Sequence, residues 1–145
     1  MNTIVCNTLS GAVSEYSRFG FHGITPTHGG SAAGLYAFGG DTDDGQSVQA
    51  SIRMPSLLRE STLKKQLVMV YLSMLGGGSA ELTVFGSAGQ WSYEFPLRES
   101  GQTRCKPGGG IRENYLGFGL TTPQGQEFTL DRVEVLLHES KTRRV

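Results

Sequence analysis

The sequence predicts an all-β protein, an antiparallel β-sandwich of the jelly-roll or immunoglobulin-like kind, formed as a single domain with a flexible N-terminal segment. Two observations predict this fold. Apolar residues recur at every second position wherever a period is visible, and glycine-rich turns separate these stretches at short intervals. A length of 145 residues suits one hydrophobic core and is too short for two of ordinary size.

The clearest strand is residues 91–97, in which every second residue is apolar. The apolar set is Trp91, Tyr93, Phe95 and Leu97. Residues 80–85 show the same alternation, and the glycine-rich segment 86–89 lies between the two stretches. Alternation on both sides of a short turn is typical of a β-hairpin, so we expect these two strands to pair.

A second hairpin is predicted upstream. Residues 48–54 alternate in polarity and end at Pro55, and residues 34–38 form a short apolar stretch before them. Segment 39–45 is rich in Gly and Asp, which tolerate positive φ angles, so we expect it to be the turn between the two strands.

Residues 65–75 carry apolar side chains at both odd and even positions, which fits a central strand covered on both faces or a helix. The residues Val68, Val70 and Tyr71 favour the strand, and the triplet 76–78 of glycines predicts a sharp end.

The C-terminal third predicts two more strands. Residues 115–120 are apolar with Gly117 and Gly119 between them, which indicates a bulge or a close approach of another backbone. In residues 128–137 the apolar positions change phase, because Phe128 and Leu130 are even-numbered while the later apolar residues Val133, Val135 and Leu137 are odd-numbered. We therefore expect a one-residue slip near Asp131 and Arg132.

The expected organisation has three parts. Residues 1–33 form a partly irregular arm, in which Val13, Tyr16, Phe19 and Phe21 could belong to a strand and residues 22–33 are coil. Residues 34–140 form the sandwich, and residues 141–145 form a basic tail.

Composition narrows the function classes. Thirteen Lys and Arg balance thirteen Asp and Glu, and charged residues make up only 18% of the chain. Without a net positive charge, no specific nucleic-acid binding is expected. The longest apolar run, residues 67–75, is about half the length of a membrane-spanning helix, so no membrane segment is expected. The distant Cys6 and Cys105 are expected to be two reduced thiols, since the chain is expected to be made in the cytoplasm.

The sequence carries no catalytic signature, so we expect no enzyme, no cofactor and no metal site. The acidic group Asp41, Asp43 and Asp44 resembles part of a calcium loop, but the distal acid of such a loop is missing. A hairpin turn is the simpler interpretation, and ion binding there stays open. The glycines at 108–110 lack the spacing of a phosphate-binding loop.

Two basic groups are candidate interaction sites. One flanks the triglycine loop and consists of Arg104, Lys106 and Arg112. The other is in the tail and consists of Lys141, Arg143 and Arg144.

Two aromatic residues are a further candidate. Trp91 and Tyr93 could form a glycan platform, which would make the protein a carbohydrate-binding sandwich that recognises a host surface glycan. Aromatic residues at strand spacing are more often part of the core.

Several segments together resemble small virion structural proteins of tailed bacteriophages. The resemblance spans nearly the whole chain and rests on residues 7–16, 34–45, 64–65, 112–120, 125–131 and 143–145. It includes the pattern Gly-x-x-Phe-x-Leu-Asp at residues 125–131 and the final Arg-Arg-Val. The resemblance implies a non-enzymatic particle component of the tail, tail tip or neck, which forms a homo-oligomeric ring and contacts other virion proteins.

Overall fold

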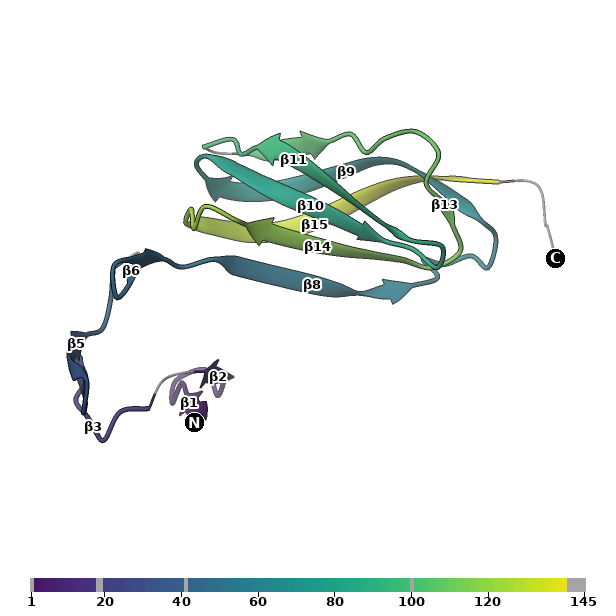
Figure 1. The fold of residues 1–145 in the computed structure, drawn as a ribbon. Helices are drawn as coiled ribbons and strands as arrows, with labels where there is room; N and C mark the ends of the chain where they lie inside the picture. The colour runs from purple at the N-terminus through teal and green to yellow at the C-terminus, as the bar shows by residue number, and fades with distance from the viewer. Residues whose placement is uncertain (1, 18–19, 41, 100, 141–145) are drawn as a thin grey trace. The chain divides into compact units, whose positions relative to one another are not determined.

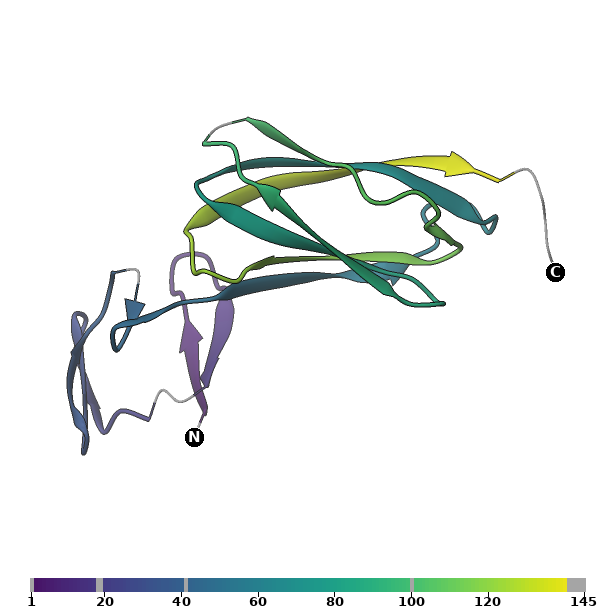
Figure 2. The ribbon, with the colours of Figure 1, turned by 45° about the horizontal axis from the view of Figure 1, so that its top comes forward.

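The computed structural model describes residues 2–17, 20–40, 42–99 and 101–140. The described residues form antiparallel strands and turns and contain no helix, so the predicted all-β class is confirmed. The chain divides into two compact units, Met1–Gly40 and Asp41–Val145, both of which are visible in Figures 1 and 2.

The larger unit contains two antiparallel sheets of four strands each (Figure 1). The first sheet has the order β11 (Gln90–Pro96), β10 (Ser79–Phe85), β14 (Leu116–Thr122) and β8 (Ala50–Leu57). The second sheet is built on β9 (Lys65–Gly76). On one edge of β9 lie β12 (Gln102–Cys105) and β13 (Arg112–Glu113), and on the other edge lies β15 (Phe128–Glu139).

One hydrophobic core fills the space between the two sheets. Its buried side chains come from the inward faces of both sheets, as expected for a sandwich. From β9 they are Leu67, Val70, Leu72 and Met74; from β10 Ala80, Leu82 and Val84; and from β14 Leu116, Phe118 and Leu120.

The predicted hairpin of residues 80–97 is confirmed, with Val84 opposite Trp91 and Ala80 opposite Phe95. The predicted strand at 65–75 is also confirmed, and it ends at Gly76 as the glycine triplet indicated. The prediction that both faces of this strand are covered by other parts of the chain was wrong. The outward residues Val68 and Leu75 are 38% and 49% exposed, because among the described residues no second layer packs on that face.

The glycines of β14 mark close approaches, as predicted. A Cβ at Gly117 would lie 2.5 Å from Ser56 Oγ, and a Cβ at Gly119 would lie 3.1 Å from the Phe85 ring. The pairing of β14 with β8 shifts register between Leu116 and Phe118. The predicted slip in β15 is present as well, because its register against β9 shifts between Leu130 and Arg132.

The predicted hairpin of residues 34–54 is wrong. Residues Gly34–Ala37 form β5, which pairs with β4 (His28–Ser31) in the smaller unit and so does not belong to the sandwich. The Asp and Gly cluster instead closes a tighter hairpin of β6 (Thr42–Asp43) and β7 (Gln46–Ser47). Asp44 and Gly45 have φ angles of 48° and 76°, which suit a two-residue hairpin loop.

Strand β8 starts at Ala50 and continues through Pro55, where we expected it to end. It lies at the edge of its sheet and pairs only with β14 among the described strands. An edge strand tolerates proline, because one side of its backbone needs no hydrogen-bond donor.

The smaller unit consists of a hairpin and a three-stranded sheet. The hairpin joins β1 (Asn2–Cys6) to β2 (Val13–Ser17), and the sheet has the order β3 (Gly23–Ile24), β4, β5. The coil expected at 22–33 is therefore wrong. Phe21 packs against the rings of Tyr36 and Phe38 at centroid distances of 5.7 and 5.6 Å. Phe19 lies outside the described residues.

Replacing Phe118 tests the assigned core. Its side chain is 0% exposed, so Phe118→Ala is expected to lower the free energy of unfolding by about 3–5 kcal/mol through a cavity between the sheets. Tyr115→Ala is the matched control, because Tyr115 is 47% exposed and its loss is expected to cost about 0.5 kcal/mol or less. Equal losses in denaturant titration would contradict the facing of β14.

Candidate interaction surface

Strand alternation turns the three basic residues of the triglycine region outward. Thr103, Cys105 and Pro107 are buried, whereas Arg104 and Lys106 between them are exposed. Arg112 is likewise exposed. The three cations therefore lie on the outer side of the second sheet, along the edge formed by β12, β13 and the loop that joins them.

The register of β9 gives the spacing of these cations. Arg104 is opposite Tyr71, and Arg112 is opposite Gln66. The two arginines are thus five residues apart along β9, or about 16 Å at the usual rise of a strand. They form a basic edge and do not converge on one pocket.

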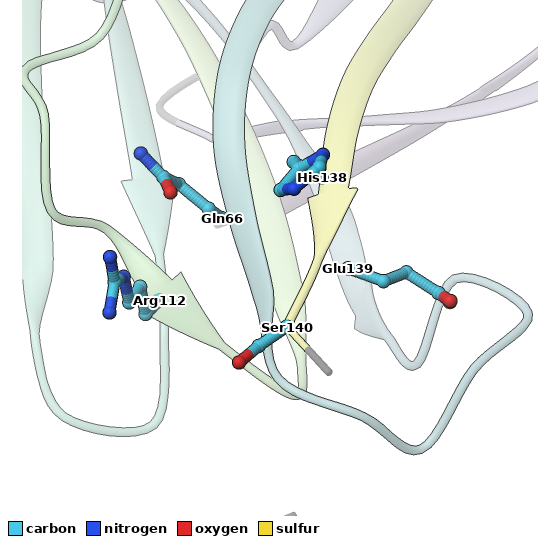
Figure 3. A pocket seen from close by; sticks show the side chains of 5 residues that line it. All are labelled: Gln66, Arg112, His138, Glu139 and Ser140. Carbon is cyan, nitrogen blue, oxygen red and sulfur yellow. The ribbon is translucent and has the colours of Figure 1, made fainter. Parts of the chain in front are cut away.

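A shallow hollow of about 330 Å³ lies at the Arg112 end of this edge (Figure 3). Its lining consists of Gln66, Arg112, His138, Glu139 and Ser140. Arg112 and His138 are both register partners of Gln66, on opposite sides of β9. The Ser140 N–H donates to the Lys64 carbonyl at 2.8 Å, so the second sheet ends here. The tail residues Lys141, Arg143 and Arg144 follow in sequence and lie outside the described residues.

Beneath this end of the sheet lies a buried lysine. Lys65 is 1% exposed, and its Nζ donates to the carbonyls of Leu63 at 2.9 Å and Asn114 at 3.3 Å and to the carbonyl of Ser61. These carbonyls belong to the loop before β9 and to the residue after β13. The ammonium group therefore joins two chain segments that are distant in sequence.

Glu113, the register partner of Lys65, makes a second link. It is 6% exposed, and its Oε1 accepts a hydrogen bond from the Ala88 N–H at 3.1 Å. A Cβ at Gly86 would lie 2.6 Å from Glu113 Cγ, so glycine is needed for this approach. The contact attaches the turn between β10 and β11 to β13, the strand that also contains Arg112.

The structural roles of Lys65 and Glu113 were not predicted. The sequence did contain one signal for Lys65. It lies two residues before Leu67 on the same strand, so alternation turns both side chains toward the core. A lysine at such a position is unusual unless its charge is satisfied, and only the folded chain brings the three carbonyls to it.

The aromatic candidates for a glycan platform face the interior of the sandwich. Trp91 and Tyr93 are half-buried and pack against the core. A Cβ at Gly108 would lie 3.2 Å from the Tyr93 hydroxyl. This position favours the interpretation of the two rings as part of the core.

The two thiols are free, as predicted, and differ in environment. Cys6 is exposed, whereas Cys105 faces the core and is 3% exposed. Burial raises the pKa of the Cys105 thiol to about 12, because the low-dielectric surroundings disfavour the thiolate. At neutral pH Cys105 is therefore protonated and a poor nucleophile.

Within the described part of the chain, no three His, Cys, Asp or Glu side chains come together in a way that could hold a metal ion. Asp41 of the acidic segment lies outside that part. The described residues also form no helix with the length and apolarity to cross a bilayer. Comparison of the sequence with known protein families and with curated proteins finds no match.

Replacing Lys65 tests its structural role. Lys65→Met keeps the length of the side chain but removes the donor from three half-buried carbonyls, so we expect a loss of about 1–3 kcal/mol in the free energy of unfolding. The neighbouring Lys64 is exposed, and Lys64→Met is the control, with a change of about 0.5 kcal/mol or less. Similar stabilities of the two variants in urea would refute this role for Lys65.

Proposed function

We propose that this protein is a non-enzymatic structural subunit of a bacteriophage virion, placed in the tail, tail tip or neck. It assembles with copies of itself and with neighbouring virion proteins. The proposal extends the resemblance of the sequence to small phage virion proteins, and three features of the molecule support it: the exposed smaller unit, the unpaired sheet edges and the basic edge.

The observation that carries the proposal is the surface of the smaller unit. Ile4, Val13 and Leu35 are 74%, 67% and 75% exposed there, and Leu9 is 97% exposed. Residues 1–40 contain only two charged residues, Glu15 and Arg18. A segment that remains free in solution is usually rich in charge, whereas an apolar, nearly neutral surface is typical of an interface.

The larger unit supports assembly in a second way. Among the described strands, β8 is an edge strand of the first sheet and β15 is an edge strand of the second. An edge strand presents unpaired backbone groups to other chains. The formal net charge of the chain is zero, so copies approach without strong repulsion. Repeated contacts between unlike surfaces close into a ring when the rotation between copies closes. Arg104, Lys106 and Arg112 supply a surface for acidic neighbours.

Detection of the chain in purified particles tests the proposal. Particles of the phage that encodes it are banded on a density gradient, and their proteins are quantified by mass spectrometry. We expect the chain to co-sediment with the particles in a fixed ratio to the major tail proteins, and an abundant host protein serves as the control for contamination. A chain that is expressed during infection but absent from the particles would refute the proposal.

A further inference from the structure

We propose that copies of this chain stack face to face, so that the outer face of the first sheet of one copy meets the outer face of the second sheet of the next. This inference rests on the proposed function, because it names the two surfaces through which copies assemble. The contact that fixes the stack joins Arg104 of one copy to the pair of Glu81 and Glu94 on its neighbour.

Two glutamates lie side by side on the outer face of the first sheet. Glu81 on β10 is the register partner of Glu94 on β11, and both point away from the core, because their chain neighbours Ala80, Leu82 and Phe95 are buried. Side chains opposite each other on antiparallel strands lie about 5 Å apart, and two like charges in such a pair are destabilising. Among the described residues, no ion pair involves either glutamate. The folded chain therefore leaves the repulsion between these carboxylates uncompensated.

The groups around the glutamate pair are neutral donors. The Ser79 hydroxyl donates to Oε1 of one glutamate at 2.9 Å, and the Thr83 hydroxyl donates to Oε1 of the other at 3.4 Å. A cation on the same face, Arg53, instead lies over the Phe85 ring, 4.2 Å from its centre. Hydroxyl groups do not cancel two negative charges, so this face lacks a cation that another molecule can supply.

The outer face of the second sheet presents such a cation. Arg104 on β12, Tyr71 on β9 and Glu134 on β15 are register partners and form one row across this face. Glu134 is already paired with Arg132 at 3.1 Å, whereas no ion pair among the described residues involves Arg104. The β12 end of the row therefore carries an exposed guanidinium group that is free to bind carboxylates.

The two charged groups lie on the same side of the sandwich and at the same level. Strands β8 and β15 line one cavity and so share a side, which puts β11 and β12, at the other edges of their sheets, together on the opposite side. Glu94 lies two residues before the end of β11, and Arg104 lies two residues after the start of β12. In the connection between these strands, the Arg98 N–H donates to Thr103 Oγ1 at 3.3 Å. The acidic and basic groups thus lie at matching positions on the two outer faces.

A second copy of the chain is the occupant that this charge complementarity favours. When the first sheet of one copy is placed on the second sheet of another with the strands aligned, the glutamate pair lies over Arg104. At the other end of the two rows, Glu134 lies over Thr121 and Ser51, whose side chains are hydroxyls and not carboxylates. Because the two contacting faces differ, a pair of copies leaves one face of each kind free. The contact can therefore repeat, and it closes into a ring if the rotation between copies closes.

Two variants of the full-length chain, each with one face altered, test the inference. Arg104→Glu removes the cation from the second-sheet face, and Glu94→Lys cancels the charge of the pair on the first-sheet face. By sedimentation velocity at low ionic strength, we expect the Kd of self-association of each variant alone to rise at least about tenfold over that of the unaltered chain. The matched control is Lys64→Glu, which makes the same change of charge at an exposed site seven residues from Tyr71, and its association is expected to stay unchanged.

An equimolar mixture of the two variants distinguishes a lost contact from a lost fold. The Arg104→Glu copy keeps its glutamate pair and the Glu94→Lys copy keeps Arg104, so the mixture is expected to form one-to-one complexes with the affinity of the unaltered chain. In thermal unfolding, Glu94→Lys is expected to be at least as stable as the unaltered chain, because it replaces a like-charged pair by an opposite one.

Three results would overturn the inference: an unaltered chain that stays monomeric at every concentration tested, an Arg104→Glu variant that associates like the unaltered chain, and a mixture that forms no complexes. A chain that is found in particles but does not stack in this way would overturn this inference alone. Absence of the chain from particles would overturn the proposed function, whatever the sedimentation shows.

Discussion

The pairing of β9 along both of its edges is the constraint on which the larger unit depends. On one side β9 bonds to β12 and β13, and on the other it bonds to β15 along almost its whole length. This double pairing fixes which side chains point inward, so that Leu67, Val70, Leu72 and Met74 form one wall of the core. Among the described strands, β12, β13 and β15 of the second sheet pair only with β9, so β9 holds that sheet together.

The candidate surface follows from the same pairing. Because β12 and β13 are in register with β9, their alternate residues face the core and their arginines face outward. The buried Lys65 and Glu113 then anchor the loops at one end of the sheet, which keeps Arg112 beside the end of β15. The hydrogen bonds of two buried polar side chains, Lys65 and Glu113, thus hold the basic edge in place on the outer face of the second sheet.

Alternation in the sequence was sufficient to predict the strands whose pairing is local or whose phase is marked. The hairpin of β10 and β11 has its turn in the sequence, and the slip near Arg132 is visible as a change of phase. The pairing of β8 with β14 was not predictable, because it joins residues that are 59 to 72 positions apart and no turn marks it. For the same reason the sequence could not show that Lys65 meets the Asn114 carbonyl, 49 positions away. The pairing of residues 34–37 with β4 is local, and it was missed because His28–Ser31 contains two glycines and shows no alternation of apolar residues.

Amide hydrogen exchange on the full-length chain tests the central position of β9 most directly. Leu72 is paired with Thr103 on one side and Val133 on the other, so its amide is expected to exchange only through global unfolding. The amide of Ile4, in the uncovered hairpin, is expected to exchange roughly a thousandfold faster in the dilute, unassembled protein. The central position of β9 would be contradicted if the Leu72 amide exchanged as fast as the Ile4 amide, or as fast as the amides of the edge strand β8.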